Sequence, residues 1–178
     1  WPPKSIRISA RRSPPPTEMA NLFRSRALGA LAAVSFYSAA LSASVAEQAM
    51  ILPVDPDPLL ITTSKGDVRL DVEVTDTQVE HARGLMFRPP LPQGRGMLFV
   101  MGEEELQVFW MRNTPSPLDL IFAAKDGSIV SIKQGEPLSE AQIPSDKPAK
   151  YVLEVAQGEA ARLGIQPGDR MRHRLIQP

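Results

Sequence analysis

The chain has 178 residues, of which 43% are hydrophobic and 22% are charged, as in an ordinary single globular domain. The formal net charge is zero, but six basic side chains and one acidic side chain lie before residue 47, so the remainder carries −5. A domain of that sign has no electrostatic surface for phosphate backbones, which argues against non-specific nucleic-acid binding.

The amino-terminal part predicts export rather than fold. Residues 1–18 lack periodicity and do not begin with methionine, so they are interpreted as a non-native upstream segment. Residues 19–46 begin with methionine, carry two arginines and continue as an uncharged, alanine-rich run, which is typical of an export signal cleaved before Glu47. A permanent membrane anchor is the alternative, because twenty uncharged residues suffice to span a bilayer. We therefore expect a periplasmic or extracellular protein that meets the membrane only through this segment.

The folded part is expected to follow a proline-rich stretch. Residues 47–58 predict a linker or an irregular lead-in, and residues 59–178 a single globular domain. Apolar and charged residues alternate over 67–75, which predicts a half-buried strand paired with 59–64 across the Lys65-Gly66 turn.

Further along, short strands dominate the pattern. Thr77 and Glu80 have the spacing of a capping box, which predicts a helix over 77–84. Asp126-Gly127 predicts a hairpin turn. Other strands are expected over 97–101, 106–111, 118–123, 128–134, 151–155 and 169–175, and a second helix over 158–164. The fold class is therefore mainly β (α+β): a compact antiparallel sandwich or barrel of short strands with two short helices.

Six motifs carry a family resemblance. They are ARGLMFR at 82–88, GMLFVM at 96–101, FWMRNT at 109–114, PLDLIF at 117–122, KYVLEVAQG at 150–158 and LGIQPGDR at 163–170. In this order the chain resembles the domain of unknown function 192 family over about residues 59–176. The resemblance implies a compact, mainly β domain that is often exported or membrane-anchored and has no established activity. The chain departs from the family's pattern at Met101, where an aromatic residue is common, and at Ser116, where an aliphatic one is common.

The motifs also supply the candidate site. Polar side chains interrupt apolar segments at five positions, namely Arg83, Asn113, Thr114, Asp119 and Glu154. Buried polar groups require partners, so we expect these side chains to meet one another, with Arg83 forming a fork on Asp119 or Glu154. Trp110 or Phe109 would supply an apolar wall if the cluster faces a cleft, although core filling is the commoner use of such a tryptophan.

Several functions remain open at this point. The polar cluster is either a structural seam or part of a cleft that binds an unknown small polar ligand, which favours an extracytoplasmic ligand-binding or envelope-accessory module. A low-turnover hydrolase or lyase using Asp119 and Glu154 is an alternative. A protein-interaction module is another, and it would show an exposed apolar patch around residues 88–95.

Much chemistry is excluded by what the sequence lacks. Without cysteine there are no disulfides, thiol nucleophiles or zinc-thiolate sites. The two histidines, His81 and His173, lie at no metal-ligand spacing and suggest no Ser-His pair, and they are interpreted as a solvated helix residue and a face residue of the last strand. No metal site and no cofactor are expected.

Overall fold

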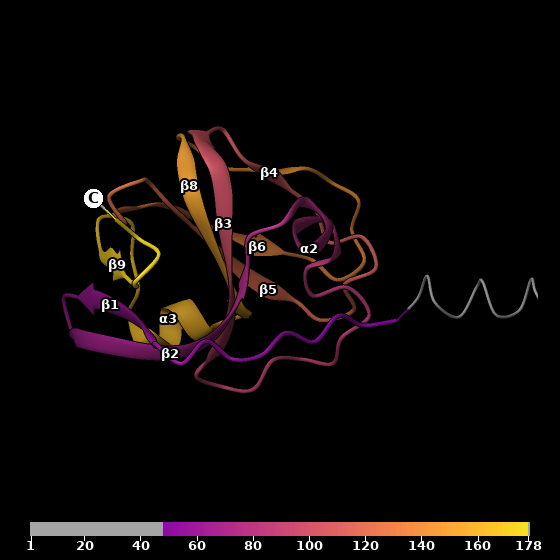
Figure 1. The fold of residues 1–178 in the computed structure, drawn as a ribbon, viewed down its shortest axis with the longest axis horizontal. Coiled ribbons are helices and arrows are strands. Elements are labelled where there is room, and N and C mark those ends of the chain that lie inside the picture. Colours follow the sequence, from indigo (N-terminus) through magenta and orange to yellow (C-terminus); the bar gives the residue numbers. More distant parts are fainter. Residues whose placement is uncertain (1–47, 178) are drawn as a thin grey trace, which may run out of the picture. The chain divides into compact units, whose positions relative to one another are not determined.

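The computed structural model describes residues 48–177, so the predictions for residues 1–18 and 19–46 lie outside the described residues. Two short helices are present, α2 (Gln78–Arg83) and α3 (Glu159–Leu163). The strands are β1 (Leu59–Thr63), β2 (Gly66–Thr75), β3 (Arg95–Glu105), β4 (Val108–Phe109), β5 (Leu118–Ala123), β6 (Ile129–Gly135), β7 (Ile143–Pro144), β8 (Ala149–Ala156) and β9 (Arg170–Arg172). The predicted mainly β fold with two short helices is confirmed (Figure 1).

Local sequence signals account for the first elements. β1 and β2 form the expected hairpin, in which the Thr63 hydroxyl donates to the Gly66 carbonyl oxygen at 2.8 Å. α2 begins with the predicted capping box: the Glu80 amide donates to the Thr77 hydroxyl, and the Glu80 carboxylate accepts from the Thr77 amide. A capped helix of six residues therefore forms directly after β2.

Seven strands form one sheet in the order β6-β5-β8-β3-β2-β1-β9, and β4 pairs with β7 in a separate two-stranded ribbon. Every pairing in the large sheet is antiparallel except that between β2 and β3, which is parallel. The sheet is thus mainly antiparallel with one parallel pair, because α2 and the segment after it carry the chain back before β3 begins.

The sheet curls until its two edges meet. The amide of Ile129, at the start of β6, donates to the Asp169 carbonyl oxygen at 2.8 Å, and the Met171 amide in β9 donates to the Gly127 carbonyl oxygen at 2.8 Å. Gly127 has a positive φ of 84°, and a Cβ there would lie 2.3 Å from the Met171 carbonyl oxygen. The close approach of these edges, which closes the sheet into a short barrel, therefore requires glycine at this position.

Two hydrophobic clusters lie on opposite faces of the sheet. The inner cluster fills the barrel and takes side chains from all seven strands and from α3, including Leu59, Leu70, Leu98, Ile121, Ile129, Leu153, Ala160 and Met171. The outer cluster lies on the other face of β3, β5 and β8 and includes Leu85, Leu91, Met97, Phe99, Met111, Leu118, Leu120, Phe122 and Val152. β5 is buried at every position because the inner cluster covers one of its faces and the outer cluster covers the other.

Two predicted strands are shorter than expected. Only Val108–Phe109 of the segment 106–111 is strand, and the last strand ends at Arg172. His173 therefore lies beyond the strand, where its Nε2 is 3.0 Å from the Asp57 carbonyl oxygen and its side chain is buried. Residues 103–105 are the exposed end of β3.

The lead-in before β1 is attached to the barrel rather than separate from it. The Leu52 amide donates to the Glu73 carboxylate at 3.0 Å, and the Asp55 amide donates to the Val72 carbonyl oxygen at 2.8 Å. Arg174 forms an ion pair with Asp55. The lead-in is thus an irregular part of this unit. Within residues 48–177, neither helix has the length and apolar character needed to cross a membrane.

Candidate functional site

The two candidate carboxylates lie on opposite faces of the sheet. Directly opposed residues in antiparallel strands share a face, and Glu154 is opposite Met97 on β3 and Leu120 on β5, both members of the outer cluster. Asp119 is opposite Val155, a member of the inner cluster. The sheet therefore separates the two groups, and the proposed acid and base pair of a hydrolase or lyase is wrong.

Asp119 instead holds the start of α3. Its Oδ2 accepts hydrogen bonds from the Gly158 amide at 2.9 Å and from the Ala160 amide at 3.1 Å. Gly158, the residue before the helix, offers no side chain for capping, so the strand carboxylate satisfies these backbone donors. Asp119 is 3% exposed and has a structural role in the described structure.

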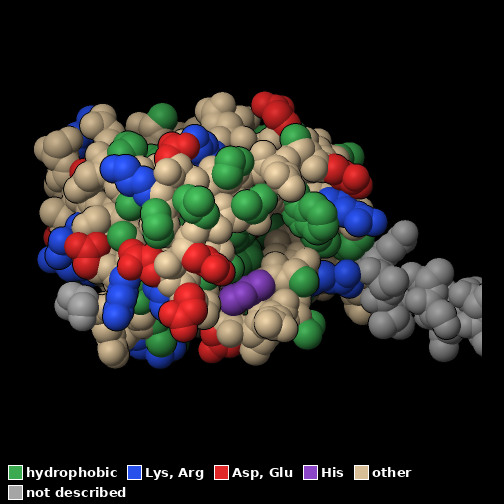
Figure 2. All heavy atoms as spheres, turned by 90° about the horizontal axis from the view of Figure 1, so that it is seen from above, with side chains coloured by type: hydrophobic (Ala, Val, Ile, Leu, Met, Phe, Trp, Pro, Cys, Tyr) green, Lys and Arg blue, Asp and Glu red, His purple; other side chains and the backbone are tan. Residues whose placement is uncertain are grey.

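Glu154 lies in a cleft on the outer face, which we call the Glu154 cleft. It has a volume of about 280 Å³ and is lined by α2 and the turn after it (residues 81–86), by Phe99 and Met101 of β3, by residues 108–110, by Thr114 and by Glu154. Figure 2 shows a face on which several hydrophobic side chains lie near a hollow with a histidine at its edge. Three other predicted site residues, Arg83, Trp110 and Thr114, line the same cleft.

The Glu154 carboxyl is the unusual group of this cleft. The side chain is 5% exposed, and no described residue forms a hydrogen bond or an ion pair with it. Burial disfavours the charged form and raises the pKa of Glu154 to about 8. The group is therefore mostly a neutral acid at neutral pH.

Aromatic rings make the walls of the cleft. Phe99 lies edge-to-face with Phe109, with ring centroids 5.2 Å apart, and Phe109 lies edge-to-face with Phe122 at 5.9 Å. Trp110 is 49% exposed at the cleft, so the interpretation of this residue as core is wrong. Phe109 thus packs against Phe99 and Phe122, which holds its ring in the wall.

α2 contributes one further side of the cleft. The His81 ring is 5.9 Å from the Phe99 ring, and its Nε2 is 3.2 Å from the Thr75 carbonyl oxygen, which can only accept. Nε2 therefore carries a proton, and His81 is not the freely solvated helix residue that was expected. Gly84, where α2 ends, has a φ of 45°, and a Cβ there would lie 3.2 Å from the Phe99 ring. Glycine thus lets the turn approach the aromatic wall.

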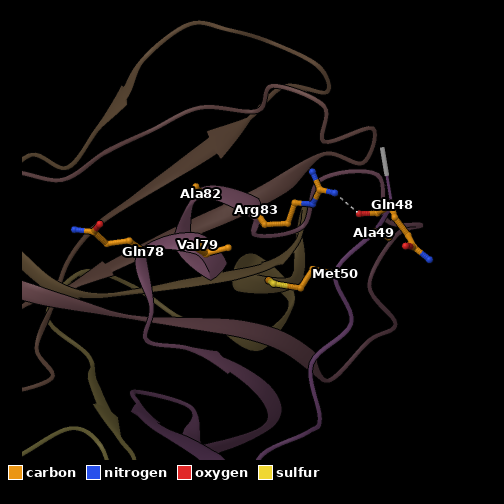
Figure 3. A pocket seen from close by; sticks show the side chains of 7 residues that line it. All are labelled: Gln48, Ala49, Met50, Gln78, Val79, Ala82 and Arg83. Atoms are coloured by element: carbon orange, nitrogen blue, oxygen red, sulfur yellow. Dashed lines mark hydrogen bonds between the residues drawn. The ribbon is translucent and has the colours of Figure 1, made fainter. Parts of the chain in front are cut away.

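Arg83 does not form the predicted fork with either candidate carboxylate. Its Nη2 donates to the Gln48 carbonyl oxygen at 2.7 Å, and its guanidinium lies 5.3 Å from the centre of the Phe87 ring. Figure 3 shows the side chain extending from α2 toward Gln48, beside a wider depression of about 630 Å³ lined by the lead-in and α2. Arg83 thus borders the Glu154 cleft while its charge faces the lead-in.

Asn113 and Thr114 shape the loop beside the cleft. Asn113 has a positive φ of 57°, and its carbonyl oxygen accepts from the Phe87 amide at 2.8 Å. The Thr114 amide donates to the Met111 carbonyl oxygen at 2.9 Å, which closes the turn. Asn113 therefore acts through its backbone, whereas Thr114 also lines the cleft. The expected mutual contact of all five polar side chains is wrong.

The buried ion pair of this domain is one that the sequence did not reveal. The Arg88 guanidinium donates to both carboxylate oxygens of Glu73, at 2.6 and 2.8 Å, and both side chains are buried. Burial alone would raise the pKa of Glu73, but the bonds from Arg88 and the Leu52 amide outweigh it and hold that pKa below its usual value. Alternation along 67–75 predicted that Glu73 faces solvent. In the structure, Arg88 and the lead-in cover the Glu73 side chain and bury it.

The loop at residues 88–95, where a protein-interaction module would show an exposed apolar patch, exposes Pro89, Pro90 and Pro92 but no large hydrophobic side chain. Leu91 is buried in the outer cluster. The exposed large hydrophobic side chains lie elsewhere, and those at the Glu154 cleft are Val108 and Trp110. Nor do three His, Asp or Glu side chains within residues 48–177 lie close enough together to hold a metal ion.

Comparison with known proteins agrees with this architecture. The model of the DUF192 family, described as Uncharacterized ACR, matches residues 60–173. The chain belongs to the DUF192 family. No curated protein matches it.

Two solved structures resemble the DUF192 domain over most of their length. One is a proposed transcription regulator from Sinorhizobium meliloti 1021, with 38% identity, a TM-score of 0.65, and coverage of 69% of this chain and 97% of that one. The other is a protein of unknown function from Novosphingobium aromaticivorans, with 37% identity, a TM-score of 0.64, and coverage of 72% and 96%. The DUF192 fold is therefore established for this chain.

Proposed function

We propose that the DUF192 domain of this chain is an extracytoplasmic small-ligand-binding module, and that its ligand occupies the Glu154 cleft. The observation that carries the proposal is the Glu154 carboxyl, which is buried at the cleft without a partner among the described residues. A molecule bound in the cleft can supply the hydrogen-bond partner that the described residues do not give this carboxyl.

The shape of the cleft supports the same proposal. Ligand pockets combine apolar and aromatic walls with a few polar groups that orient the ligand. Phe99, Phe109 and Trp110 supply the walls, and Glu154 and Thr114 supply the polar groups. The volume of about 280 Å³ suits a small molecule rather than a polymer.

Regulation of transcription by DNA binding is not extended to this chain from its Sinorhizobium relative. Residues 48–177 carry eighteen acidic and fourteen basic side chains, a net charge of −4. DNA-binding surfaces are positive, because phosphate contacts supply much of their affinity.

A matched pair of variants tests ligand binding. Val108 lines the cleft and is 54% exposed, whereas Leu106, two residues earlier, is 63% exposed and does not line it. We expect ligand-observed NMR screening of small polar compounds to yield binders that Val108→Trp blocks and Leu106→Trp retains. A screen without binders, or binders that are insensitive to Val108→Trp, would remove the basis of the proposal.

Export is a separate part of the proposal and rests on residues 19–46. Expression of the full chain in a Gram-negative host, followed by fractionation and amino-terminal sequencing, should give a periplasmic protein that begins at Glu47. Recovery from the membrane fraction with residues 19–46 intact would favour the anchor instead. Recovery of the uncleaved chain from the cytosol would contradict export altogether.

A further inference from the structure

The Glu154 cleft also indicates which kind of ligand it would take. We propose that the ligand carries a basic amine, whose ammonium group pairs with the Glu154 carboxylate while the aromatic wall surrounds it. This inference rests on the proposed function and names the ligand class for that same site.

The side chains that line the cleft do not balance the charge of an ionised Glu154 carboxylate. Two cationic or titratable side chains besides Glu154 line it, His81 and Arg83, and both come from α2. His81 donates from Nε2 to the Thr75 carbonyl oxygen, and Arg83 donates to the Gln48 carbonyl oxygen. Burial is the only cause of the raised pKa of Glu154, with no contribution from a neighbouring charged side chain. The cation that would make ionised Glu154 stable therefore has to come from the ligand.

The aromatic wall of the cleft also favours a cationic ligand. Ammonium groups are attracted to the faces of aromatic rings, most strongly to tryptophan, and the attraction grows when water is excluded. Phe99, Phe109 and Trp110 all line the cleft. Trp110 already interacts with one cation, because the Arg112 guanidinium lies 5.9 Å from its ring centre. A carboxylate beside aromatic walls is a site for a small organic cation.

The competing ligand class is a neutral or anionic molecule that accepts a hydrogen bond from protonated Glu154. The affinities of the two ligand classes change in opposite directions with pH. An ammonium ligand requires the ionised carboxyl, so its affinity rises with pH, whereas an acceptor ligand requires the protonated carboxyl, so its affinity falls. With a pKa of about 8, roughly 1% of the carboxyls are ionised at pH 6 and half at pH 8. The affinity of an amine should therefore rise about 50-fold between these pH values.

The experiment compares three probes of similar shape: benzylammonium, benzyl alcohol and benzoate. Isothermal titration calorimetry at pH 6, 7 and 8 measures their affinities for residues 47–178, the expected exported chain, and for variants of it. At pH 8 we expect benzylammonium to bind at least ten times more tightly than the other two. Glu154→Gln should abolish both this preference and the pH dependence. Glu140→Gln, which changes an exposed carboxyl outside the cleft, should leave the pH dependence in place.

The outcomes separate this inference from the proposed function. Equal or tighter binding of benzyl alcohol or benzoate, or benzylammonium affinity that falls from pH 6 to pH 8, overturns the amine assignment. The amine assignment also fails if benzylammonium does not bind while other compounds bind wild type and are blocked by Val108→Trp. In that case the proposal of small-ligand binding is retained. If no compound binds the cleft, both proposals fail.

Discussion

The substitution Glu154→Gln should change the way in which stability depends on pH. In the folded domain, burial raises the pKa of Glu154 to about 8, whereas the same group has a pKa of 4.5 when it is not perturbed. Below pH 4.5 the carboxyl is protonated in both the folded and the unfolded chain, so it adds no penalty. Between pH 4.5 and pH 8 the unfolded chain releases its proton while the folded domain keeps it, and stability falls as pH rises.

The size of the effect follows from the two pKa values. The free energy of unfolding should fall by about 1.4 kcal/mol per pH unit within this window. The total loss is about 5 kcal/mol and is complete above pH 8, where the carboxyl ionises in both states. This is a large part of the stability of a small domain, so a bound cation that paired with Glu154 would also stabilise the fold.

Urea denaturation of wild type and Glu154→Gln at pH 5, 6, 7, 8 and 9 measures this term. The variant should gain stability relative to wild type as pH rises to 8, and the gain should then level off. A constant shift in the variant's free energy of unfolding, caused by its buried amide, does not change how the difference from wild type depends on pH. Glu140→Gln is the matched control, because that side chain is 73% exposed, and it should show no such gain. A wild-type minus variant difference that stays flat from pH 5 to pH 8 would refute the burial of an unpaired carboxyl.

Three further substitutions test the fold by urea denaturation. Asp119→Ala removes the acceptor of two backbone amides and should cost about 2–3 kcal/mol. Asp119→Asn keeps an acceptor and should cost less. Equal losses of stability would contradict the role of Asp119 in holding the start of α3. Arg88→Met removes both short bonds to the buried Glu73 carboxylate and leaves it only the Leu52 amide and a longer contact with Arg95, so it should cost about 3 kcal/mol, against less than about 1 kcal/mol for Arg69→Met in an exposed pair. Gly127→Ala should cost at least about 1 kcal/mol more than Gly66→Ala. Both glycines have positive φ, but only at Gly127 would the added Cβ clash with a backbone oxygen. Similar losses of stability for the two variants would argue against barrel closure at Gly127.

The cleft illustrates what residue patterns do and do not predict. Glu154 and Asp119 both interrupt apolar runs, and the prediction that both are buried is confirmed. Their positions differ by only one step in the β5–β8 register, yet that step places them on opposite faces. Register depends on which strands pair and how the sheet curls, so no local pattern around either residue could show that only Glu154 reaches the cleft.

The segment FWMRNT makes the same point for the wall. Its apolar residues predicted a strand over 106–111 in which Trp110 either forms the wall of a cleft or fills the core, but only Val108–Phe109 pairs, with β7. Met111 is buried and Trp110 is half exposed at the cleft. Hydrophobicity identified the segment as part of an apolar surface, and the neighbouring elements determined which of its side chains face solvent.

Information within a few residues was sufficient for the β1–β2 hairpin, the capping box of α2 and the mainly β class, because turns, caps and alternation depend on neighbours in the chain. Six ordered motifs were also sufficient to identify the DUF192 family. Barrel closure at Gly127, the Arg88–Glu73 pair and the isolation of Glu154 depended on segments distant in sequence. Which polar group is paired and which is left for a ligand is decided by packing, since burial and partners exist only once the strands have come together.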